Sequence, residues 1–487
     1  MTTETLGADA PVALAGRIPI PYADRIFSGY SEFFLTCTTL GAASYAYLVG
    51  VSLAAIGTTW IGILGYTLGM IIGGAFVAFA VGSFSYRFGV DIVDASKFAL
   101  GLRGSVVVLV GVMLVCGGWA NVLLAMTARG TIDLFSQQSA GPRSGDETLV
   151  IVAGFVLIGL VWWLVSHGAK MMERAASWCA IVQVLVAVVV VVLVARKYGL
   201  VSTFHTNVDP KKAYAADRHL QLSYAVEFGV ANGLTLFPFF GGLARLVKHR
   251  RHLVGPAVGG CCILGCAFVS AAGALAAIGT GQEGLSQLLF GVAGLAWGRF
   301  LLAIVLVANI GTMVAQFYIV GLALQQIRLF ARIGWKVVCA AILAPAVLAV
   351  LNTQWLLDHV ITFVAYSGVV FIGLSSILFV DYFVLRRQRI VVEQLFAVSG
   401  KRIYWFWGGI NWIAVFVIAL TTCVYLVIFD PVTLRFAGPF RYFGASVPTL
   451  LIGGLVYYVL MKLLAVGRGR GGYVDGNVDP TPVEVGL

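Results

Sequence analysis

The sequence predicts an all-α integral membrane protein that crosses the bilayer twelve times, and three observations lead to this fold class. First, 60% of the 487 residues are hydrophobic and only 11% are charged, whereas soluble domains are about 45–50% apolar and about 25% charged. Second, apolar segments of membrane-spanning length follow one another along the whole chain. Third, basic residues alternate in abundance between successive connectors, as the positive-inside rule describes. This composition excludes a water-soluble enzyme and a disordered chain.

Twelve apolar segments are expected, each near the length of about 20 residues that a membrane helix needs. Those of the first half lie near 28–54, 57–83, 104–128, 148–167, 173–195 and 222–244. Those of the second half lie near 253–279, 297–325, 335–352, 358–384, 405–429 and 443–466. The tail from about residue 467 is polar and rich in Gly and Pro, and we expect it to be disordered.

The basic residues predict the orientation of the chain. Of the 32 Lys and Arg residues, 22 lie in or beside the two tails and the connectors after even-numbered segments, and 10 lie on the other side. This excess places both termini in the cytoplasm. The net charge of +11 thereby has a topological explanation, and we expect the lipid bilayer rather than nucleic acid as the partner. The N-terminus lacks the features of a cleaved signal peptide.

Several kinds of site are not expected. The eight cysteines lie in apolar stretches without paired spacing, and the six histidines lie at connectors without metal-ligand spacing, so neither a disulfide framework nor a zinc site is predicted. The sequence also lacks a Gly-rich phosphate-binding motif. We therefore expect no cofactor and no ATP-driven pump.

Two segments contain short runs of small and polar residues near mid-span, where lipid offers no partner for a backbone freed from a helix. The runs are Thr38–Ser44 in segment 1 and Glu227–Gly233 in segment 6, the latter followed by Pro238. Small residues also serve close helix packing, so each run alone has a structural explanation. Matched interruptions five helices apart, however, indicate the binding site of a transporter.

Three stretches stand out in order along the chain: RFGVDIVDASKFALGLRGS at 87–105, DYFVLRR at 381–387 and YWFWGGINW at 404–412. In this order and spacing they resemble the nucleobase:cation symporter family, which includes cytosine permeases and the bacterial hydantoin transporter. The resemblance covers the chain from about residue 25 to about residue 457.

The resemblance implies a fold of two inverted repeats of five helices each, followed by two accessory helices. The expected parts are a cytoplasmic tail at 1–27, a first repeat at 28–195, a second repeat at 222–384, accessory helices at 405–466 and a C-terminal tail at 467–487. In this fold a bundle of helices 1, 2, 6 and 7 moves against a scaffold of helices 3, 4, 8 and 9, with substrate held midway across the membrane.

The resemblance also implies a substrate site. The family's stacking Trp in helix 3 falls on Trp119, whose indole offers a large flat apolar face. Gly41 and Ala42 lie at the first break, and Asn232 at the second carries an amide that donates and accepts hydrogen bonds. Gln316 in helix 8 is a further candidate for the amide edge of a substrate.

At three positions the chain departs from the family. A second stacking Trp, a Gln and an acid of the family fall on Gly233, Leu123 and Gly242. Gly233 remains a candidate for the substrate site because it lies at the expected break. With one aromatic wall in place of two, the site is expected to suit a ring bulkier than hydantoin or cytosine.

A sodium site is implied by the same resemblance. Its ligands fall on the carbonyl groups of Thr38, Gly41 and Ala308 and on the hydroxyl of Thr312, whereas Gly311 lacks the second hydroxyl of the family. A hard cation needs several oxygen ligands, so this loss keeps a proton open as the coupling ion.

Two acids lie within or beside the apolar segments. Glu227 is a candidate for binding a ring nitrogen of the substrate or for carrying a coupling proton, because intramembrane acids usually face a cavity. Glu32 lies near the start of segment 1, where an acid suits the first turn of a helix.

These observations predict a secondary transporter of the cell membrane. Its cargo is a nucleobase or related heterocycle of the cytosine, uracil, purine, hydantoin or allantoin class, imported with sodium or a proton. The same fold carrying an amino acid or a thiamine precursor is the alternative. A membrane enzyme or sensor would need a cluster of titratable residues or a soluble output domain, and the sequence contains neither. No feature calls for a partner chain, so a monomer is expected.

The charge asymmetry makes a testable prediction about topology. A reporter fused after residue 215 should lie outside the cytoplasm, and one fused at the C-terminus should lie inside it, because the basic connectors stay in the cytoplasm. Paired reporters that are active on only one side of the membrane check both positions. A C-terminus outside the cytoplasm would contradict the prediction.

Overall fold

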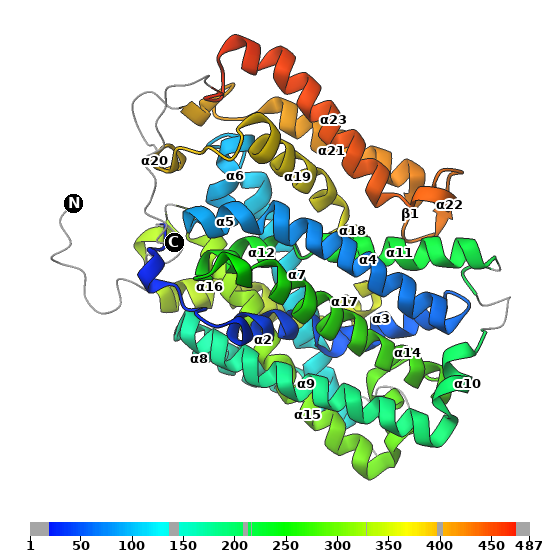
Figure 1. Ribbon diagram of the computed structural model, residues 1–487. Coiled ribbons are helices and arrows are strands. Elements are labelled where there is room, and N and C mark those ends of the chain that lie inside the picture. Colours follow the sequence, from blue (N-terminus) through cyan, green and yellow to red (C-terminus); the bar gives the residue numbers. More distant parts are fainter. Residues whose placement is uncertain are drawn as a thin grey trace.

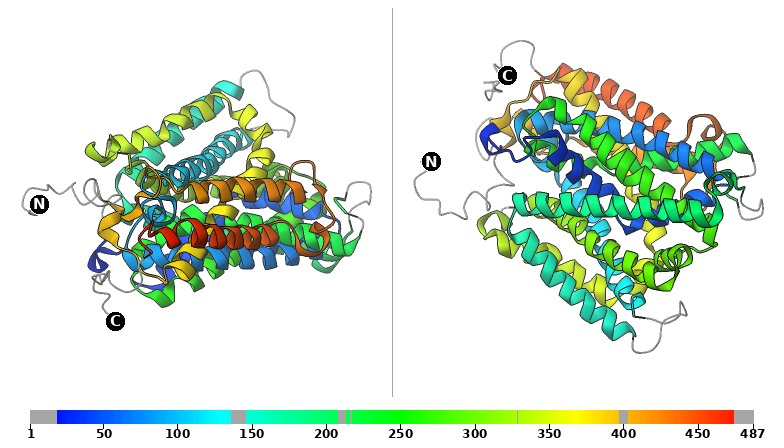
Figure 2. Two further views of the ribbon diagram at one scale, coloured as in Figure 1. Left: turned by 90° about the horizontal axis from the view of Figure 1, so that it is seen from above. Right: turned by 60° about the horizontal axis from the view of Figure 1, so that its bottom comes forward.

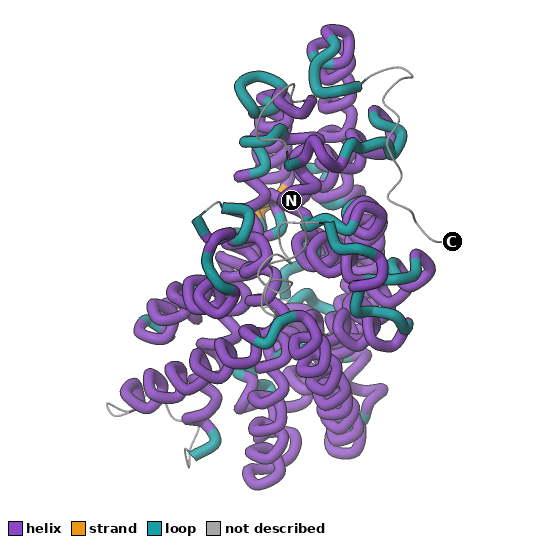
Figure 3. Tube along the Cα trace, turned by 90° about the vertical axis from the view of Figure 1, so that its left-hand side faces the viewer, coloured by secondary structure: helices purple, strands orange, loops and turns teal. Residues whose placement is uncertain are grey.

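The computed structural model describes residues 19–135, 146–207, 213–215, 217–327, 329–396 and 403–473. Helices dominate these ranges, and the strand pair drawn there is short: β1 (Phe429–Asp430) and β2 (Arg435–Phe436) (Figure 3). Within the same ranges, eight helices are long and apolar enough to cross a membrane, or nine if the bent first pair counts as one span. Three shorter apolar helices, Trp335–Leu351, Val369–Leu385 and Trp412–Ile428, add further candidates. An all-helical multi-pass protein is therefore confirmed, whereas the count of twelve stays a prediction.

The helices of the first half follow the predicted segments closely. They are α2 (Tyr30–Gly41), α3 (Ser44–Ala54), α4 (Thr59–Ala80), α5 (Gly82–Phe88), α6 (Ile92–Leu100), α7 (Val106–Asp133), α8 (Asp146–Ser166), α9 (Ala169–Tyr198) and α10 (Leu200–His205). The short amphipathic α6 lies in the connector between segments 2 and 3. In Figure 1 the long helices run side by side across the molecule.

The second half contains more interruptions. Its longer helices are α11 (Arg218–Leu234), α12 (Phe237–Leu243), α14 (Val269–Thr280), α15 (Leu285–Leu324), α16 (Trp335–Leu351), α18 (Val360–Ser367), α19 (Val369–Phe379), α21 (Trp412–Ile428) and α23 (Ser446–Leu464). Two π-helical stretches, η4 (Ala257–Phe268) and η6 (Val380–Leu385), continue into α14 and from α19. Short pieces complete the chain: η1 (Tyr22–Asp24), η2 (Ala244–Leu246), η3 (Arg250–His252), α13 (Val254–Pro256), η5 (Phe330–Arg332), α17 (Thr353–Asp358), α20 (Val392–Leu395), η7 (Ile403–Trp405), α22 (Phe440–Phe443) and η8 (Val466–Arg468).

The last two long helices form an edge of the bundle. α21 and α23 pack on each other and on α19, and they lie together at the top of Figure 1 and of the right-hand view in Figure 2. The end of α23 and the start of α2 both lie towards the left in Figure 1. Such an arrangement leaves the interior of the bundle to the preceding helices.

The first predicted break is confirmed. α2 ends at Gly41 and α3 begins at Ser44, and the two helices meet at an angle of 58°. The residues between them, Ala42 and Ala43, are completely buried. The interruption therefore lies in the protein interior, which is where a membrane protein tolerates one.

The second predicted break is misplaced. Glu227–Gly233 lies inside the continuous helix α11, and the irregular residues are Thr235 and Leu236, just before α12. Pro238 in the first turn of α12 has no N–H to donate back along the chain, which explains why the ladder is interrupted here. The Thr235 hydroxyl donates to the carbonyl oxygen of Asn232 at 2.6 Å.

The glycines of α11 serve packing. A Cβ atom on Gly229 would lie 2.2 Å from the carbonyl oxygen of Tyr66, and one on Gly69 would lie 2.1 Å from that of Val226. A Cβ on Gly233 would meet the backbone of α4 in the same way, 2.6 Å from the nitrogen of Gly74. The small residues therefore let α4 and α11 approach backbone to backbone, and the predicted break at this run was wrong for this reason.

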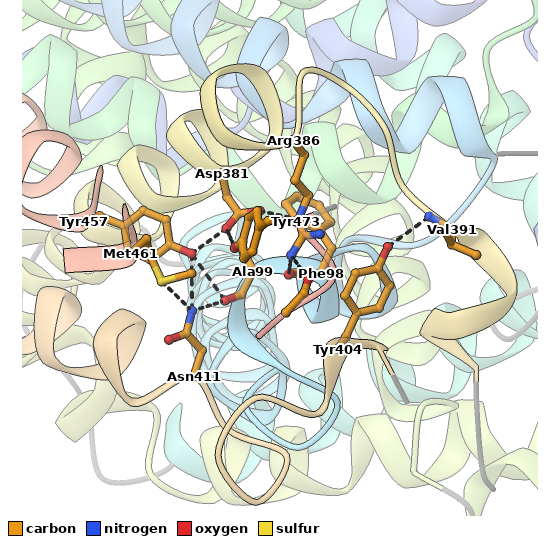
Figure 4. Close-up of polar contacts among 11 residues, drawn as sticks. Phe98, Ala99, Asp381, Arg386, Val391, Tyr404, Asn411, Tyr457, Met461 and Tyr473 are labelled. Carbon is orange, nitrogen blue, oxygen red and sulfur yellow. Dashed lines mark hydrogen bonds and ion pairs between the residues drawn. The ribbon is translucent and has the colours of Figure 1, made fainter. Parts of the chain in front are cut away.

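A buried polar cluster, which we call the Arg386 cluster, holds the end of α6 (Figure 4). Arg386 donates to a carboxylate oxygen of Asp381 at 2.6 Å and to the carbonyl oxygen of Phe98 at 2.6 Å. The Asn411 amide donates to the carbonyl oxygen of Ala99 at 2.7 Å. These donors satisfy carbonyl groups that the end of a helix leaves free. The three stretches that carry the family resemblance thus meet in one cluster.

The C-terminal segment joins the same cluster. Arg386 donates to the carbonyl oxygen of Gly471 at 2.8 Å, and the hydroxyl groups of Tyr457 and Tyr473 both donate to Asp381. Disorder from about residue 467 is therefore wrong for 467–473. The remainder of that predicted tail, and residues 1–18 of the N-terminal tail, lie outside the described residues.

The contact between α4 and α11 makes the second prediction. Gly229→Ala should lower the free energy of unfolding by about 1–3 kcal/mol, because the added methyl meets backbone atoms that cannot retreat. Gly159 in α8 is the matched control, since a Cβ there meets nothing within 4 Å. Thermal unfolding in detergent should show a loss for Gly229→Ala and none for Gly159→Ala. Equal melting temperatures for Gly229→Ala and the wild type would contradict the close packing.

Candidate functional site

The break between α2 and α3 is the centre of the candidate site. The end of α2 leaves carbonyl groups without helical partners, and the start of α3 leaves N–H groups without them. One of these carbonyl groups, that of Leu40, accepts a hydrogen bond from the hydroxyl of Tyr45. The remaining groups form a set of buried backbone dipoles that can bind an ion or a polar ligand.

α15 contacts the carbonyl side of the break. The hydroxyl of Thr312 donates to the carbonyl oxygen of Thr39 at 2.8 Å, and the two threonine hydroxyl oxygens lie 3.2 Å apart. Both residues are completely buried. Ala308 is also buried, one helical turn before Thr312. The structure thus brings Thr312 to the break, where it contacts Thr39. The sequence did not single out Thr39 as a ligand.

Thr38 and Gly41, the two residues of α2 expected to supply carbonyl ligands, both lie against η4. The carbonyl oxygen of Thr38 accepts from Ala42 N at 2.8 Å, and a Cβ on Gly265 of η4 would lie 2.6 Å from it. A Cβ on Gly41 would meet the carbonyl oxygen of Cys261 in η4 at 2.6 Å. In the structure described, therefore, the Thr39 carbonyl and not that of Thr38 meets Thr312.

Trp119 of α7 lies beside the break among aromatic rings. It is 5% exposed, its ring centroid lies 4.8 Å from that of Tyr45 in α3, and it lies 5.6 Å from that of Phe363 in α18. Gly118 makes room for this contact, because a Cβ there would lie 2.5 Å from the Phe363 ring. Rings from two other elements, α3 and α18, therefore converge on Trp119 of α7. Tyr45 and Phe363 were missed in the sequence, where one aromatic residue in an apolar span looks like any other.

Two amide side chains offer polar groups. Asn232 of α11 is half-buried and donates to the hydroxyl of Tyr66 at 2.5 Å, while the Thr235 hydroxyl lies 3.3 Å from its amide oxygen. Gln316 of α15 is 1% exposed, and its amide oxygen has no hydrogen-bond partner among the described residues. A buried amide oxygen without a partner is costly, so Gln316 retains an acceptor for a ligand. Gly233 faces α4.

The two acids have other partners. Glu227 is 2% exposed, and its carboxylate accepts from the backbone N–H groups of Ala445 at 2.8 Å and Ser446 at 3.0 Å and from the Ser446 hydroxyl at 2.6 Å. It therefore caps the start of α23, where a negative charge is stabilised. Glu32 lies in the first turn of α2 and accepts from the backbone N–H of Ser28 at 2.8 Å. The structure does not bring either acid to the break.

A buried network on the other side of the break was not found in the sequence. Asn309 of α15 is completely buried and makes hydrogen bonds to Ser44 at the start of α3, to Thr127 of α7 and to Gln183 of α9. An Asn within an apolar helix was the available signal, because a buried amide needs partners. Across the described ranges, no group of three or more His, Cys, Asp or Glu residues could hold a metal ion.

The sequence profile of a family described as permease for cytosine/purines, uracil, thiamine, allantoin matches residues 34–442. The hydantoin permease of Microbacterium maritypicum is 33% identical to the chain over 84 residues, a stretch that spans 17% of each protein. The shared stretch is thus a small part of that permease.

Solved structures agree on the fold. The inward-facing conformation of Mhp1 matches with a TM-score of 0.72 at 16% identity, covering 95% of this chain and 97% of that one. The closed conformation of Mhp1, described as a nucleobase-cation-symport-1 family transporter with bromovinylhydantoin bound, matches at 0.69 and 17% identity, with 96% and 100% covered. An outward-open Na+-coupled sialic acid symporter matches at 0.62 and 14% identity, with 95% and 93% covered. At these identities the likeness establishes the fold alone.

Proposed function

Because the chain belongs to the family of permeases for cytosine/purines, uracil, thiamine and allantoin, we propose that it imports a nucleobase or related heterocycle by cation symport and alternating access. The observation that carries this proposal is the position of Trp119 beside the buried break of helix 1, between Tyr45 and Phe363. Flat heterocycles stack on such rings, and interrupted helices supply backbone dipoles to the same site.

The topology belongs to the proposal as well. We place both termini in the cytoplasm, with twelve membrane helices. The first inverted repeat occupies 28–195, the second 222–384 and the accessory helices 405–466. The packing of α21 and α23 on each other and on α19 supports an accessory pair. The fold shared with Mhp1 over 95% of the chain supports the rest.

Hydantoin-like rings and nucleobases are the favoured cargo. A flat ring with an amide edge would stack on Trp119 and meet the amides of Asn232 and Gln316, with the backbone of Gly41 and Ala42 at the break beneath it. The neighbours support this class, since one is a hydantoin permease and another was solved with bromovinylhydantoin bound. A thiamine precursor is the second candidate, because thiamine belongs to the description of the family. An amino-acid cargo remains the further alternative.

The proposed site makes a prediction about Trp119. Trp119→Ala should weaken binding of the best ligand at least tenfold, which corresponds to about 1.4 kcal/mol, and Trp119→Phe should keep part of the affinity because a smaller ring still stacks. Thermal shift and titration of purified protein with cytosine, uracil, hypoxanthine, hydantoin, allantoin, thiamine and amino acids would measure this. Equal affinity in all three proteins would remove Trp119 from the site. If the wild type bound none of these compounds, the proposed cargo class of nucleobases and related heterocycles would be rejected.

The coupling ion is proposed to be sodium, held between the end of α2 (helix 1 of the family's fold) and α15 (helix 8). Thr312 and the carbonyl groups at the end of α2 supply the oxygen atoms that a hard cation prefers. Thr39 takes the place expected of Thr38, and Ala308 and Gly41 complete the proposed set. A proton on Glu227 is the rival, and it is less favoured because that carboxylate caps α23.

The two coupling modes make different predictions. Thr312→Ala should abolish the stimulation of uptake by sodium, whereas Thr312→Ser should keep it because a hydroxyl remains. Sodium and substrate should raise each other's affinity by the same factor. Uptake into proteoliposomes would be measured with and without sodium at fixed pH, then across pH gradients at fixed sodium. Sodium-independent uptake that follows the pH gradient and is lost only in Glu227→Gln would overturn the sodium site.

A further inference from the structure

The side chain of Asn309 uses its full hydrogen-bonding capacity at the break of helix 1. Its amide oxygen accepts from Ser44 N at 3.1 Å and from the Gln183 amide at 3.1 Å. Its amide nitrogen donates to the Ser44 hydroxyl at 3.0 Å and to the Thr127 hydroxyl at 3.0 Å. Two acceptor and two donor positions are all that a carboxamide has, so Asn309 is saturated.

Backbone groups fix the direction of three of the four hydrogen bonds that Asn309 makes. The Ser44 backbone N–H can only donate, so the amide oxygen of Asn309 must face it. The Thr127 hydroxyl donates to the carbonyl oxygen of Leu123 at 2.7 Å, so it accepts from Asn309. The Gln183 amide also donates to the carbonyl oxygen of Val305 at 3.3 Å, which sets its orientation. Only a neutral group that donates and accepts at once satisfies these partners.

α15 thus forms hydrogen bonds on both sides of the break between α2 and α3. Thr312 donates to a carbonyl oxygen at the end of α2, and one helical turn earlier Asn309 accepts from the first N–H of α3. The chemistry matches the need at each end, since a helix end leaves carbonyl groups free and a helix start leaves N–H groups free. The start of α3 is held by more hydrogen bonds than the end of α2. Asn309 forms two hydrogen bonds with Ser44, and it also bonds to Thr127 of α7 and Gln183 of α9.

The next residue after Ser44 is Tyr45, whose ring lies against Trp119 and whose hydroxyl donates to the Leu40 carbonyl. We propose that Asn309 is a positioning residue of the transport site, which anchors the start of α3 to α7, α9 and α15 and thereby holds Tyr45 against Trp119. The inference rests on the proposed function for its ligand, although the anchoring itself does not need one.

A matched pair of substitutions tests the proposal. Asn411 is also a completely buried Asn; its amide donates to Ala99 and its oxygen accepts from Ile413 N at 3.2 Å, in the Arg386 cluster. Asn309→Ala and Asn411→Ala should both lower the melting temperature, because each leaves buried groups without partners. Only Asn309→Ala should weaken binding of the tightest ligand in the panel above, by at least tenfold.

Hydrogen exchange gives a readout that needs no ligand. Amide exchange in peptides covering residues 41–50 should be faster in Asn309→Ala than in the wild type and unchanged in Asn411→Ala. If the wild type binds no member of the panel, the proposed function fails, and the exchange comparison still decides the role of Asn309. If amide exchange in residues 41–50 were as slow in Asn309→Ala as in the wild type, the proposed anchoring role of Asn309 would be overturned.

The conservative variant Asn309→Asp adds a pH profile. A protonated Asp accepts and still donates one of the two hydrogen bonds that Asn309 donates, whereas an ionised Asp has only acceptor sites. Ligand affinity of Asn309→Asp should therefore approach that of the wild type at low pH and fall as the pH rises, while Asn411→Asp should bind as the wild type does throughout. Affinity equal to the wild type at every pH in Asn309→Asp would overturn the requirement for a neutral donor and acceptor.

Discussion

The central constraint on this structure is that a helix broken inside a membrane protein must find partners for its freed backbone groups within the protein. The break between Gly41 and Ser44 meets this constraint through α15, which supplies a hydroxyl donor to the carbonyl end and an amide acceptor to the N–H end. The Tyr45 hydroxyl satisfies one more carbonyl group. The polar side chains around the break are therefore needed for the fold before they are needed for any ligand, and a ligand can use only the groups that remain.

The sequence predicted the helical class and the first break because both depend on local composition. The second break was misplaced because a run of small residues has the same appearance whether it interrupts a helix or lets two helices touch, and here Gly229 touches α4. The role of Glu227 could not be read locally, since its partners Ala445 and Ser446 are more than 200 residues away along the chain. The change from Thr38 to Thr39 reflects where the helical bonds of α2 stop. The Thr38 carbonyl still accepts from Ala42 N, whereas Ala43 N donates to Gly41 and the Thr39 carbonyl accepts from Thr312 instead.

The residues that reveal the family are not those of the site. The three family-like stretches supply Phe98, Asp381, Arg386 and Asn411 to one buried cluster that closes the end of α6. Charged and amide groups buried together must all be satisfied, so such a cluster tolerates few changes whatever the cargo. The positions proposed for the substrate would carry no such demand, because they would meet a ligand and not a fixed protein partner. This explains how the chain matches the family over residues 34–442 while it departs from the family pattern at Gly233, Leu123 and Gly242.

The electrostatics of the break limits how an ion can act there. The described side chains that meet at the break are hydroxyl, amide, thiol and aromatic groups, and the acids Glu227 and Glu32 cap helices away from it. A cation between α2 and α15 would consequently be held by neutral dipoles, without a carboxylate to offset its charge. Dipoles stabilise a cation only when several of them point at it from short range. Its binding therefore depends on the relative position of the two helices more than a site with a carboxylate would. That dependence would link ion binding to the arrangement of α2 and α3, which we propose Asn309 sets from the same helix that carries Thr312.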